Sequence, residues 1–292
     1  IMQNSLWRYD ATSSVYGELN TGEWWKQAEC LLNQRLDHFG IEDKESHFVA
    51  PVIFFIDGTH CDRNGRLQAE PVLCSVGNIC LEERKSSSAW FINGLLPNKI
   101  GTPAERKAGK KGKGLRAPSL RMYHECLGEI YKELIQIQDN DKENGMGVAI
   151  YVSGKGMVNL HFEVCLVIGD TVGHDTLCCH YQAYSKKVAR PVRTCQVSWE
   201  NLDRHDVECQ WVYMNEIFAE IDICIQNIRN RVRVTENRER ASNLSQQLHI
   251  SIFRLLSFGG NAHGIFGATP FEVLHTLLLG IMKYSLKSLY DY

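Results

Sequence analysis

The sequence predicts an α/β protein in which a mixed sheet is flanked by helices. Two apolar runs rich in β-branched and aromatic residues, Val52–Ile56 and Val164–Ile168, are each followed closely by an acid. A long amphipathic stretch lies between the two runs. Strand patterns that alternate with helical periodicity are typical of a mixed sheet with helices packed on it.

Length and composition limit the classes of protein that fit. A chain of 292 residues with 44% hydrophobic content can bury one large core or two modest ones. The net charge of -2 gives no overall sign of a nucleic-acid binder, so we expect any such surface to be local. No apolar run approaches the roughly 20 residues of a membrane span, and no leader pattern opens the chain, so we expect neither membrane insertion nor secretion.

Eleven cysteines without a secretory leader fit a reducing, intracellular compartment. The first residue is Ile1, and an apolar helical pattern still runs near Tyr292. We therefore expect the chain to be a fragment of a longer polypeptide.

The amino-terminal third predicts one helix and several strands. Residues 1–48 are polar and rich in Trp, and they include a helix over Glu23–Arg35. Pro51 opens the first strand, which runs to Asp57. A strand pair interrupted by Pro71 is expected over Leu67–Ile79, and a short apolar segment over Trp90–Leu96.

The remainder alternates between helices and strands. Apolar residues at steps of three and four predict a helix from Pro118 that ends at Asp139-Asn140-Asp141. Strands are expected over Val148–Val152 and His161–Ile168, followed after Asp170 by an irregular Cys/His-rich stretch. A second long helix with an apolar stripe from Val212 to Ile228 leads into an arginine-rich segment, and after the glycine-rich residues 258–268, Thr269-Pro270 starts the final helix.

This order of strand and acid, strand pair, helix, strand and acid, helical insert and helix matches a ribonuclease-H-like fold. The expected domains are an amino-terminal helical flank (1–48), the first part of the core (49–170), a mostly helical insert containing Cys and His (171–257), and the end of the core (258–292).

Asp57 and Asp170 are the strongest candidates for catalysis. An acid at the end of a buried strand emerges from the sheet, where its carboxylate can face a crevice. Carboxylates on neighbouring strands suit Mg²⁺ or Mn²⁺ and two-metal phosphoryl transfer. The alternative is that each Asp simply begins a turn, a common role for this residue.

Glu272 is the candidate third acid. The apolar residues around it leave Glu272 and His275 together on the flank of the last predicted helix, one turn apart. Thr269 and Glu272 also have the spacing of a capping box, which is the alternative role. Glu216, Glu220 and Asp222 on the preceding helix are competing candidates.

A cluster of thiols and imidazoles suggests a structural zinc site. Its members lie between positions 178 and 209: Cys178, Cys179, His180, Cys195, His205 and Cys209. Such residues suit tetrahedral Zn²⁺, but no CxxC pair is present. Scattered buried or free thiols are the other interpretation.

Two basic segments are candidates for contact with DNA phosphate. Residues 106–116 carry six basic side chains, no acid and three glycines. The candidates are Arg106, Lys107, Lys110, Lys111, Lys113 and Arg116 in that segment, and Arg229, Arg231 and Arg233 in the second. The alternative interpretation is that each basic segment is only a solvated loop without a partner.

Other enzyme classes lack their motifs. The stretch around Lys155 has neither the upstream Gly nor the following Ser/Thr of a P-loop, and the glycine-rich loops lack dinucleotide spacing. Ser and Cys nucleophiles have no local signature either.

Several blocks of the chain resemble Plavaka-type transposases, which are relatives of the CACTA superfamily of eukaryotic cut-and-paste transposons. The first is VIFFIDGTHCDRNGRLQAEPVLCSVGNI (52–79), preceded by ELNTGEWW (18–25) and followed by Trp90 and NGLLP (93–97). The later ones are RMYHECL (121–127), VIGDTVGHDTLCCHY (167–181) and ATPFEVLHTLLLGIMK (268–283). The resemblance covers residues 14 to 284 approximately, and the order of the blocks is its most specific feature.

The resemblance implies a ribonuclease-H-like core with an acidic triad interrupted by an insert. By position, Asp57 is the first acid, Asp170 the second and Glu272 the third, with His60 and His275 in supporting places. Relatives carry a cysteine pair after the second acid, whereas Cys195 here stands without a CxxC partner.

Two functions are therefore expected as alternatives. One is a DDE/D transposase catalytic domain that acts in the nucleus on double-stranded transposon ends and target DNA, with Mg²⁺ or Mn²⁺ and as a homo-oligomer. The other is a catalytically inactive, transposase-derived DNA-binding or scaffold protein. Convergence of Asp57, Asp170 and Glu272 would favour the first.

Overall fold

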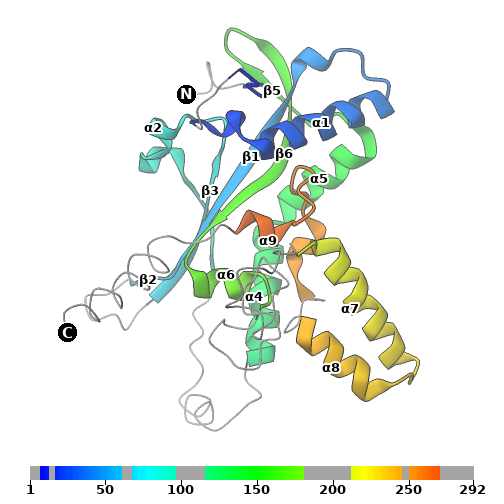
Figure 1. Ribbon diagram of the computed structural model, residues 1–292. Coiled ribbons are helices and arrows are strands. Elements are labelled where there is room, and N and C mark those ends of the chain that lie inside the picture. Colours follow the sequence, from blue (N-terminus) through cyan, green and yellow to red (C-terminus); the bar gives the residue numbers. More distant parts are fainter. Residues whose placement is uncertain are drawn as a thin grey trace, which may run out of the picture. The chain divides into compact units, whose positions relative to one another are not determined.

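The structure is a computed structural model that describes residues 7–12, 17–60, 68–96, 116–180, 212–244 and 250–269 (Figure 1). The chain divides into two compact units. The first contains residues 1–98, 125–167 and 252–264, and the second contains residues 99–124, 168–251 and 265–292. No described helix is long and apolar enough to cross a membrane.

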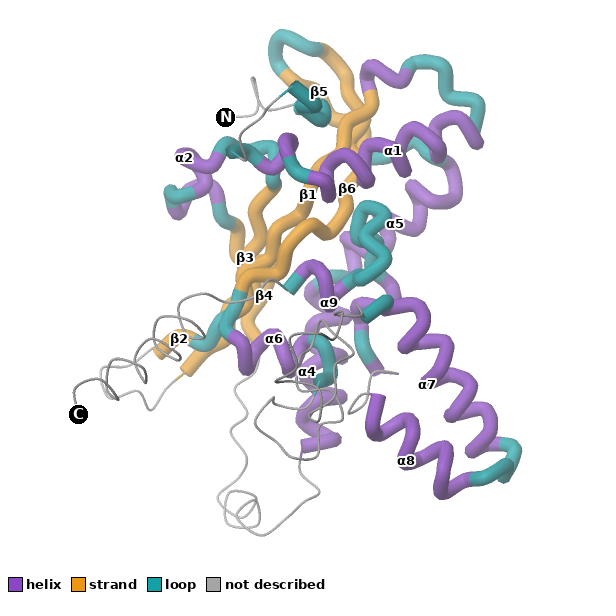
Figure 2. Tube along the Cα trace, in the orientation of Figure 1, coloured by secondary structure: helices purple, strands orange, loops and turns teal. Residues whose placement is uncertain are grey.

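A mixed six-stranded sheet forms the centre of the first unit. Its strands lie in the order β2-β3-β1-β6-β5, and β4 also pairs with β3. The pairs β1/β3, β2/β3, β3/β4 and β5/β6 are antiparallel. Figures 1 and 2 show β1 and β6 side by side, and the arrows of Figure 1 show that the two strands run in the same direction. The strands are β1 (His47–Ile56), β2 (Thr59–His60), β3 (Gln68–Val76), β4 (Phe91–Leu96), β5 (Val148–Val152) and β6 (Gly156–Ile168).

Helix α1 (Glu23–His38) covers one face of this sheet. Its buried residues recur every three or four positions, and Ala28, Leu32 and Leu36 pack with Val49 of β1. The predicted helix over Glu23–Arg35 is confirmed and continues for one further turn.

Pro51 and Pro71 lie inside their strands, whereas the sequence predicted Pro51 at a strand start and Pro71 at a break. Strand β1 begins at His47, so Pro51 lies inside it, and β3 is one continuous strand through Pro71. The β1–β3 ladder runs only from the Val52–Val76 pair to the Ile56–Val72 pair. Both prolines lie just outside this ladder, so neither missing N–H removes one of its hydrogen bonds.

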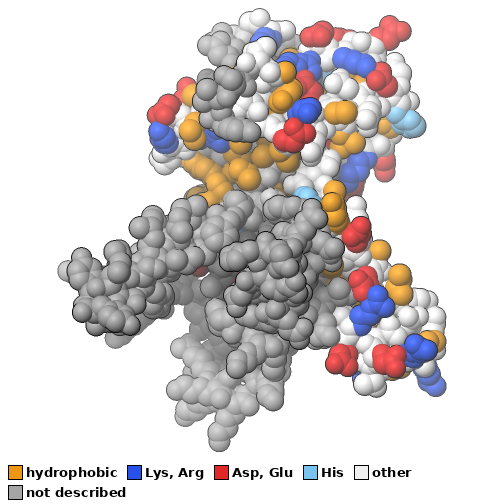
Figure 3. Space-filling model, in the orientation of Figure 1, with side chains coloured by type: hydrophobic (Ala, Val, Ile, Leu, Met, Phe, Trp, Pro, Cys, Tyr) orange, Lys and Arg blue, Asp and Glu red, His pale blue; other side chains and the backbone are white. Residues whose placement is uncertain are grey.

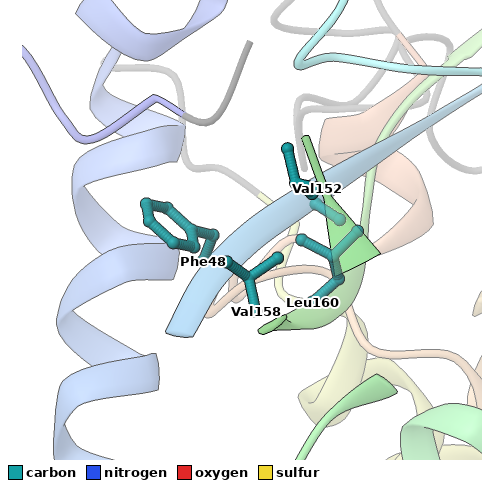
Figure 4. Close-up of a cluster of buried hydrophobic side chains, with 5 residues drawn as sticks. Phe48, Val152, Val158 and Leu160 are labelled. Carbon is teal, nitrogen blue, oxygen red and sulfur yellow. The ribbon is translucent and has the colours of Figure 1, made fainter. Parts of the chain in front are cut away.

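A small apolar cluster closes the hairpin end of the sheet (Figure 4). Phe48 of β1 packs with Val152 of β5 and with Val158 and Leu160 of β6. Each of these side chains is less than a tenth exposed. Burial on both sides of the β5–β6 turn fixes the register of the hairpin, because a shift by one residue would turn every side chain to the other face.

The long helix predicted after residue 118 consists of two helices, α4 (Arg116–Ile130) and α5 (Lys132–Asn144). Tyr131 interrupts the helix with φ −95° and ψ 3°, and its ring packs on Phe54 at 4.5 Å between centroids. The expected end at Asp139-Asn140-Asp141 is wrong, since α5 continues to Asn144 and stops at Gly145 in the left-handed region (φ 70°).

Asp141 continues the helix because it belongs to a buried ion-pair network. Arg35 of α1 binds Asp141 of α5 and, at 3.1 Å, Glu163 of β6. The second oxygen of Glu163 accepts the Gly259 N–H at 3.0 Å. All three charged side chains are at least 87% buried, so each charge depends on its partners.

Two histidines extend this network. His161 Nδ1 lies 2.9 Å from both oxygens of Asp141, and His161 Nε2 lies 2.8 Å from His47 Nδ1. Asn159 Nδ2 contacts the remaining nitrogen, Nε2 of His47, at 3.2 Å. Because a carboxylate only accepts, Nδ1 of His161 is the donor to Asp141. The contacts through His47 to Asn159 continue this chain of buried polar groups.

The described helices of the second unit are short apart from a helical hairpin. Besides the first part of α4, they are α6 (Thr171–Leu177), α7 (Met214–Arg229), α8 (Val234–Leu244) and α9 (Ile265–Ala268). The stretch after Asp170 was expected to be irregular but begins with α6, because Asp170 caps it. Outside this unit the structure also has α2 (Leu81–Arg84) and 3₁₀ turns at Leu19–Thr21, Lys44–Ser46, Ser87–Ala89 and Ile252–Leu255. The helix expected from Thr269-Pro270 lies outside the described residues.

The buried network predicts a large effect of Arg35→Ala on stability. Removal of the guanidinium leaves Asp141 and Glu163 buried without their cation, so we expect the free energy of unfolding to fall by about 3–5 kcal/mol. Lys26→Ala is the matched control on the same helix, since its ion pair with Glu23 is exposed. Urea denaturation should show a loss of less than about 1 kcal/mol for Lys26→Ala. Equal losses for the two variants would contradict this role of Arg35.

The same network predicts how stability depends on pH. Burial opposes ionisation of Asp141, but His161, Arg35 and the Gly147 N–H together hold its pKa below the ordinary value. Such an acid contributes stability above its unfolded pKa of about 3.9, and the contribution is lost as the pH falls through the lower folded pKa. Burial and His161 lower the pKa of His47, so stability should already decline as the pH falls below about 6.5.

Unfolding measured by urea between pH 7 and pH 3 tests this expectation. Asp141→Asn should be less stable at pH 7 and should lose the additional decline below about pH 4. Asp139→Asn removes an exposed acid of the same helix, which pairs with Lys142, and should keep the wild-type profile. A wild-type acid limb in Asp141→Asn would contradict the assignment.

Candidate active site

Asp57 follows β1 directly, at the point where the chain leaves the buried sheet. Ile56 is 2% exposed, whereas Asp57 is partly exposed. Among the described residues, Asp57 has no hydrogen-bond or ion-pair partner. Its carboxylate is therefore not committed to a structural contact within that part of the chain.

Asp170 follows β6 after Gly169 and is the N-cap of α6. It has extended backbone angles (φ −79°, ψ 167°), and its Oδ1 accepts a hydrogen bond from the Gly173 N–H. Its backbone carbonyl accepts from the His174 N–H at 2.9 Å. The turn-forming role considered for Asp170 is thus present, but capping uses one oxygen of a carboxylate that has about four acceptor positions.

Each of the two acids follows one of two neighbouring strands in the chain. Strands β1 and β6 are adjacent in the sheet, and each is followed by its acid within two residues. Both strands run the same way (Figure 1), so Asp57 and Asp170 each follow a carboxyl-terminal strand end. Carboxylates are the hard oxygen ligands that Mg²⁺ and Mn²⁺ prefer.

The candidates for a third acid are less well placed. Glu272 and His275 lie outside the described residues. Of the competitors on α7, Glu216 and Asp222 are exposed and Glu220 pairs with Arg240. His60 is the last residue of β2. Within the described ranges, no three His, Cys, Asp or Glu side chains converge as a metal site.

Of the residues predicted to bind zinc, Cys178, Cys179 and His180 lie in the described ranges, where each contacts a different described side chain. Cys178 Sγ lies 3.6 Å from Thr269 Oγ1, whereas Cys179 Sγ lies 3.1 Å from His124 Nε2. His180 Nδ1 lies 3.6 Å from Asp175 Oδ1. Cys195, His205 and Cys209 fall outside the described residues, so the zinc site stays a prediction.

His124 is a buried partner that the sequence interpretation missed. Burial lowers its pKa to about 4, against the opposing effect of a hydrogen bond with the Thr176 backbone. Burial, and then Cys178, raise the pKa of the Cys179 thiol. The pair is therefore a neutral imidazole with a protonated thiol, which is a poor nucleophile. The signal in the sequence that could have indicated His124 is its place in the block RMYHECL (121–127).

Only some of the predicted DNA-binding residues lie in the ranges that the structure describes. Arg106, Lys107, Lys110, Lys111 and Lys113 lie outside the described ranges, and Arg116 is the first residue of α4. Arg229 ends α7, and Arg231 and Arg233 lie in the turn that follows; all three are exposed.

Comparison with known families gives one match over nearly the whole chain. The model of the family described as Plavaka transposase matches residues 4–286. No curated protein matches the chain.

The capping geometry predicts that two substitutions of Asp170 differ in stability. Asparagine is about as good an N-cap as aspartate, so Asp170→Asn should unfold at nearly the wild-type urea concentration. Asp170→Ala should lose about 0.5–2 kcal/mol, because the Gly173 N–H loses its acceptor. Equal stability of the two variants would show that the cap does not stabilise α6.

Proposed function

The chain belongs to the Plavaka transposase family, and we propose that it is a DDE/D transposase catalytic domain with a ribonuclease-H-like core. Its substrates would be double-stranded transposon ends and target DNA. In this proposal it acts in the nucleus as a homo-oligomer assembled on DNA.

The observation that carries the proposal is the placement of Asp57 and Asp170. Neighbouring strands β1 and β6 are each followed by one of these acids. The order of elements is also consistent with the proposed core, because the antiparallel β3 and β4 and the helices α4 and α5 lie between the two acids in the chain.

The donor set fits a pair of divalent cations. The Asp57 carboxylate has no partner among the described residues, and Asp170 keeps an oxygen beyond the one that caps α6. These two acids would hold Mg²⁺ or Mn²⁺, with Glu272 as the proposed third ligand. When bound, the metal supplies an activated water and stabilises the leaving oxygen.

The proposed reaction has two steps. Water attacks the phosphorus at the transposon end and the bond to the 3′ oxygen breaks, which leaves a 3′-hydroxyl and a 5′-phosphate. The 3′-hydroxyl then attacks a phosphodiester of the target and displaces another 3′-hydroxyl. Asp170, fixed by its cap bond, and Asp57, at the end of a buried strand, present their carboxylates from ordered backbone, which reduces the reorganisation needed at the site.

Nicking and strand transfer on a cognate transposon end with Mg²⁺ or Mn²⁺ test the proposal. Asp57→Asn and Asp170→Asn remove a carboxylate without a large change in size, and the second also keeps the cap. Each variant should lose several kcal/mol of transition-state stabilisation, so its rate of nicking should decrease on the order of a thousandfold. EDTA should abolish the activity, and added Mn²⁺ should restore it.

Asp139→Asn is the control, because this acid is exposed on α5 and pairs with Lys142. It should keep wild-type activity. Wild-type rates in Asp57→Asn would overturn the catalytic assignment. A wild-type chain that binds DNA without metal-dependent cleavage would instead be an inactive, transposase-derived DNA-binding or scaffold protein.

A further inference from the structure

The turn between α7 and α8 presents a group of exposed arginines. We define the arginine turn as residues 229–233, of which Arg229, Arg231 and Arg233 are basic. The two helices pack against one another as a hairpin. In Figure 3, basic side chains gather at the turn end of this hairpin.

Two of these arginines have unusual backbone angles. Arg231 has φ 60° and Arg233 has φ 40°, both in the left-handed region. Glycine or asparagine is the usual residue in this region, because a Cβ atom is disfavoured there. The chain thus has two long cationic side chains where glycine would fit the backbone better, and backbone strain of this kind clusters at functional sites.

Asn237 of α8 holds the turn in this conformation. This residue is 9% exposed, and its Nδ2 donates to the carbonyls of Val232 at 3.2 Å and Arg233 at 3.1 Å. Its Oδ1 accepts from Asn227 Nδ2 at 3.3 Å. The Val232 N–H also donates to the Asn227 carbonyl at 2.8 Å. The arginines therefore extend from a turn that is held by hydrogen bonds to the buried Asn237 side chain.

Three of the five arginines of the hairpin lie at this turn, and the other two, Arg238 and Arg240, lie on α8. On the helices, Arg240 pairs with Glu220. Arg233 contacts Glu236 only at 3.8 Å, and both side chains are more than 70% exposed, so this pair is weak. No carboxylate within the described ranges lies at ion-pair distance from Arg229 or Arg231. The guanidinium groups at the turn are thus available to an external anion.

We propose that the arginine turn binds the phosphate backbone of duplex DNA, with Asn237 as the residue that positions it. This proposal rests on the proposed function for the identity of the anion. A guanidinium group can donate two parallel hydrogen bonds to phosphate oxygens and stays charged at any relevant pH. Contacts with phosphate carry no base information, so the turn fixes the register of the protein on DNA without reading sequence.

Binding of the full chain to a fluorescent duplex of unrelated sequence, in EDTA, tests the proposal. EDTA prevents metal-dependent cleavage, so affinity is measured separately from catalysis. Replacement of Arg229, Arg231 and Arg233 together by Gln should reduce the slope of log K against log salt by about 3, or about 1 per arginine. Arg238→Gln removes one arginine charge from an exposed position of α8 outside the turn. It should leave the slope unchanged, whereas Arg229→Gln alone should reduce it by about 1.

Two further variants separate binding from folding. Replacement of Arg231 and Arg233 together by Gly suits the left-handed backbone, so this variant should keep the wild-type melting temperature while its DNA affinity decreases. Asn237→Ala removes the brace but no charge, and it should weaken DNA binding at low salt.

The proposal is overturned if the triple Gln variant keeps the wild-type affinity and slope, or if the wild-type chain has no salt-dependent affinity for duplex DNA. It is also overturned if the turn binds poly-glutamate and not duplex DNA, since that result indicates an acidic protein partner. Nicking in Asp57→Asn is measured separately, so either proposal can fail while the other stands.

Discussion

The fold of the first unit depends on one buried cation, Arg35. It binds carboxylates from two other elements, Asp141 of α5 and Glu163 of β6, and it lies on α1. Since a buried charge without a partner is strongly destabilising, these three elements must come together for any of them to be stable. Through its second oxygen, Glu163 also fixes the segment around Gly259.

The network also links two neighbouring strands of the sheet, β1 and β6. His47 begins β1 and His161 lies in β6, and their direct contact at 2.8 Å continues the chain of hydrogen bonds from Asp141. The buried polar groups therefore link β1 to β6 at one end, and the acids Asp57 and Asp170 follow the other end of each strand.

Local patterns in the sequence predicted the elements that depend on local physics. Apolar periodicity located α1 and α7, and β-branched runs located the cores of β1 and β6. The predictions were wrong where the structure of a segment depends on a residue far away in the chain. Asp141 was predicted to end a helix, but its ion-pair partner Arg35 is 106 residues away in the chain. Pro71 was predicted to interrupt a strand, but the β1–β3 ladder ends at Val72, so Pro71 removes none of its hydrogen bonds. His124 could not be assigned because its contact with Cys179 spans 55 residues.

The central claim is that Asp57 and Asp170 hold the same metal ions. The most direct test is a double-mutant cycle on Mn²⁺ affinity, measured by the electron paramagnetic resonance of free Mn²⁺ in titrations of the full chain. The wild type, Asp57→Asn, Asp170→Asn and the double variant complete the cycle. Shared ions predict that the second substitution adds little to the first, with a coupling of about 0.5–3 kcal/mol. Losses that add to within about 0.5 kcal/mol would indicate independent sites and contradict the claim.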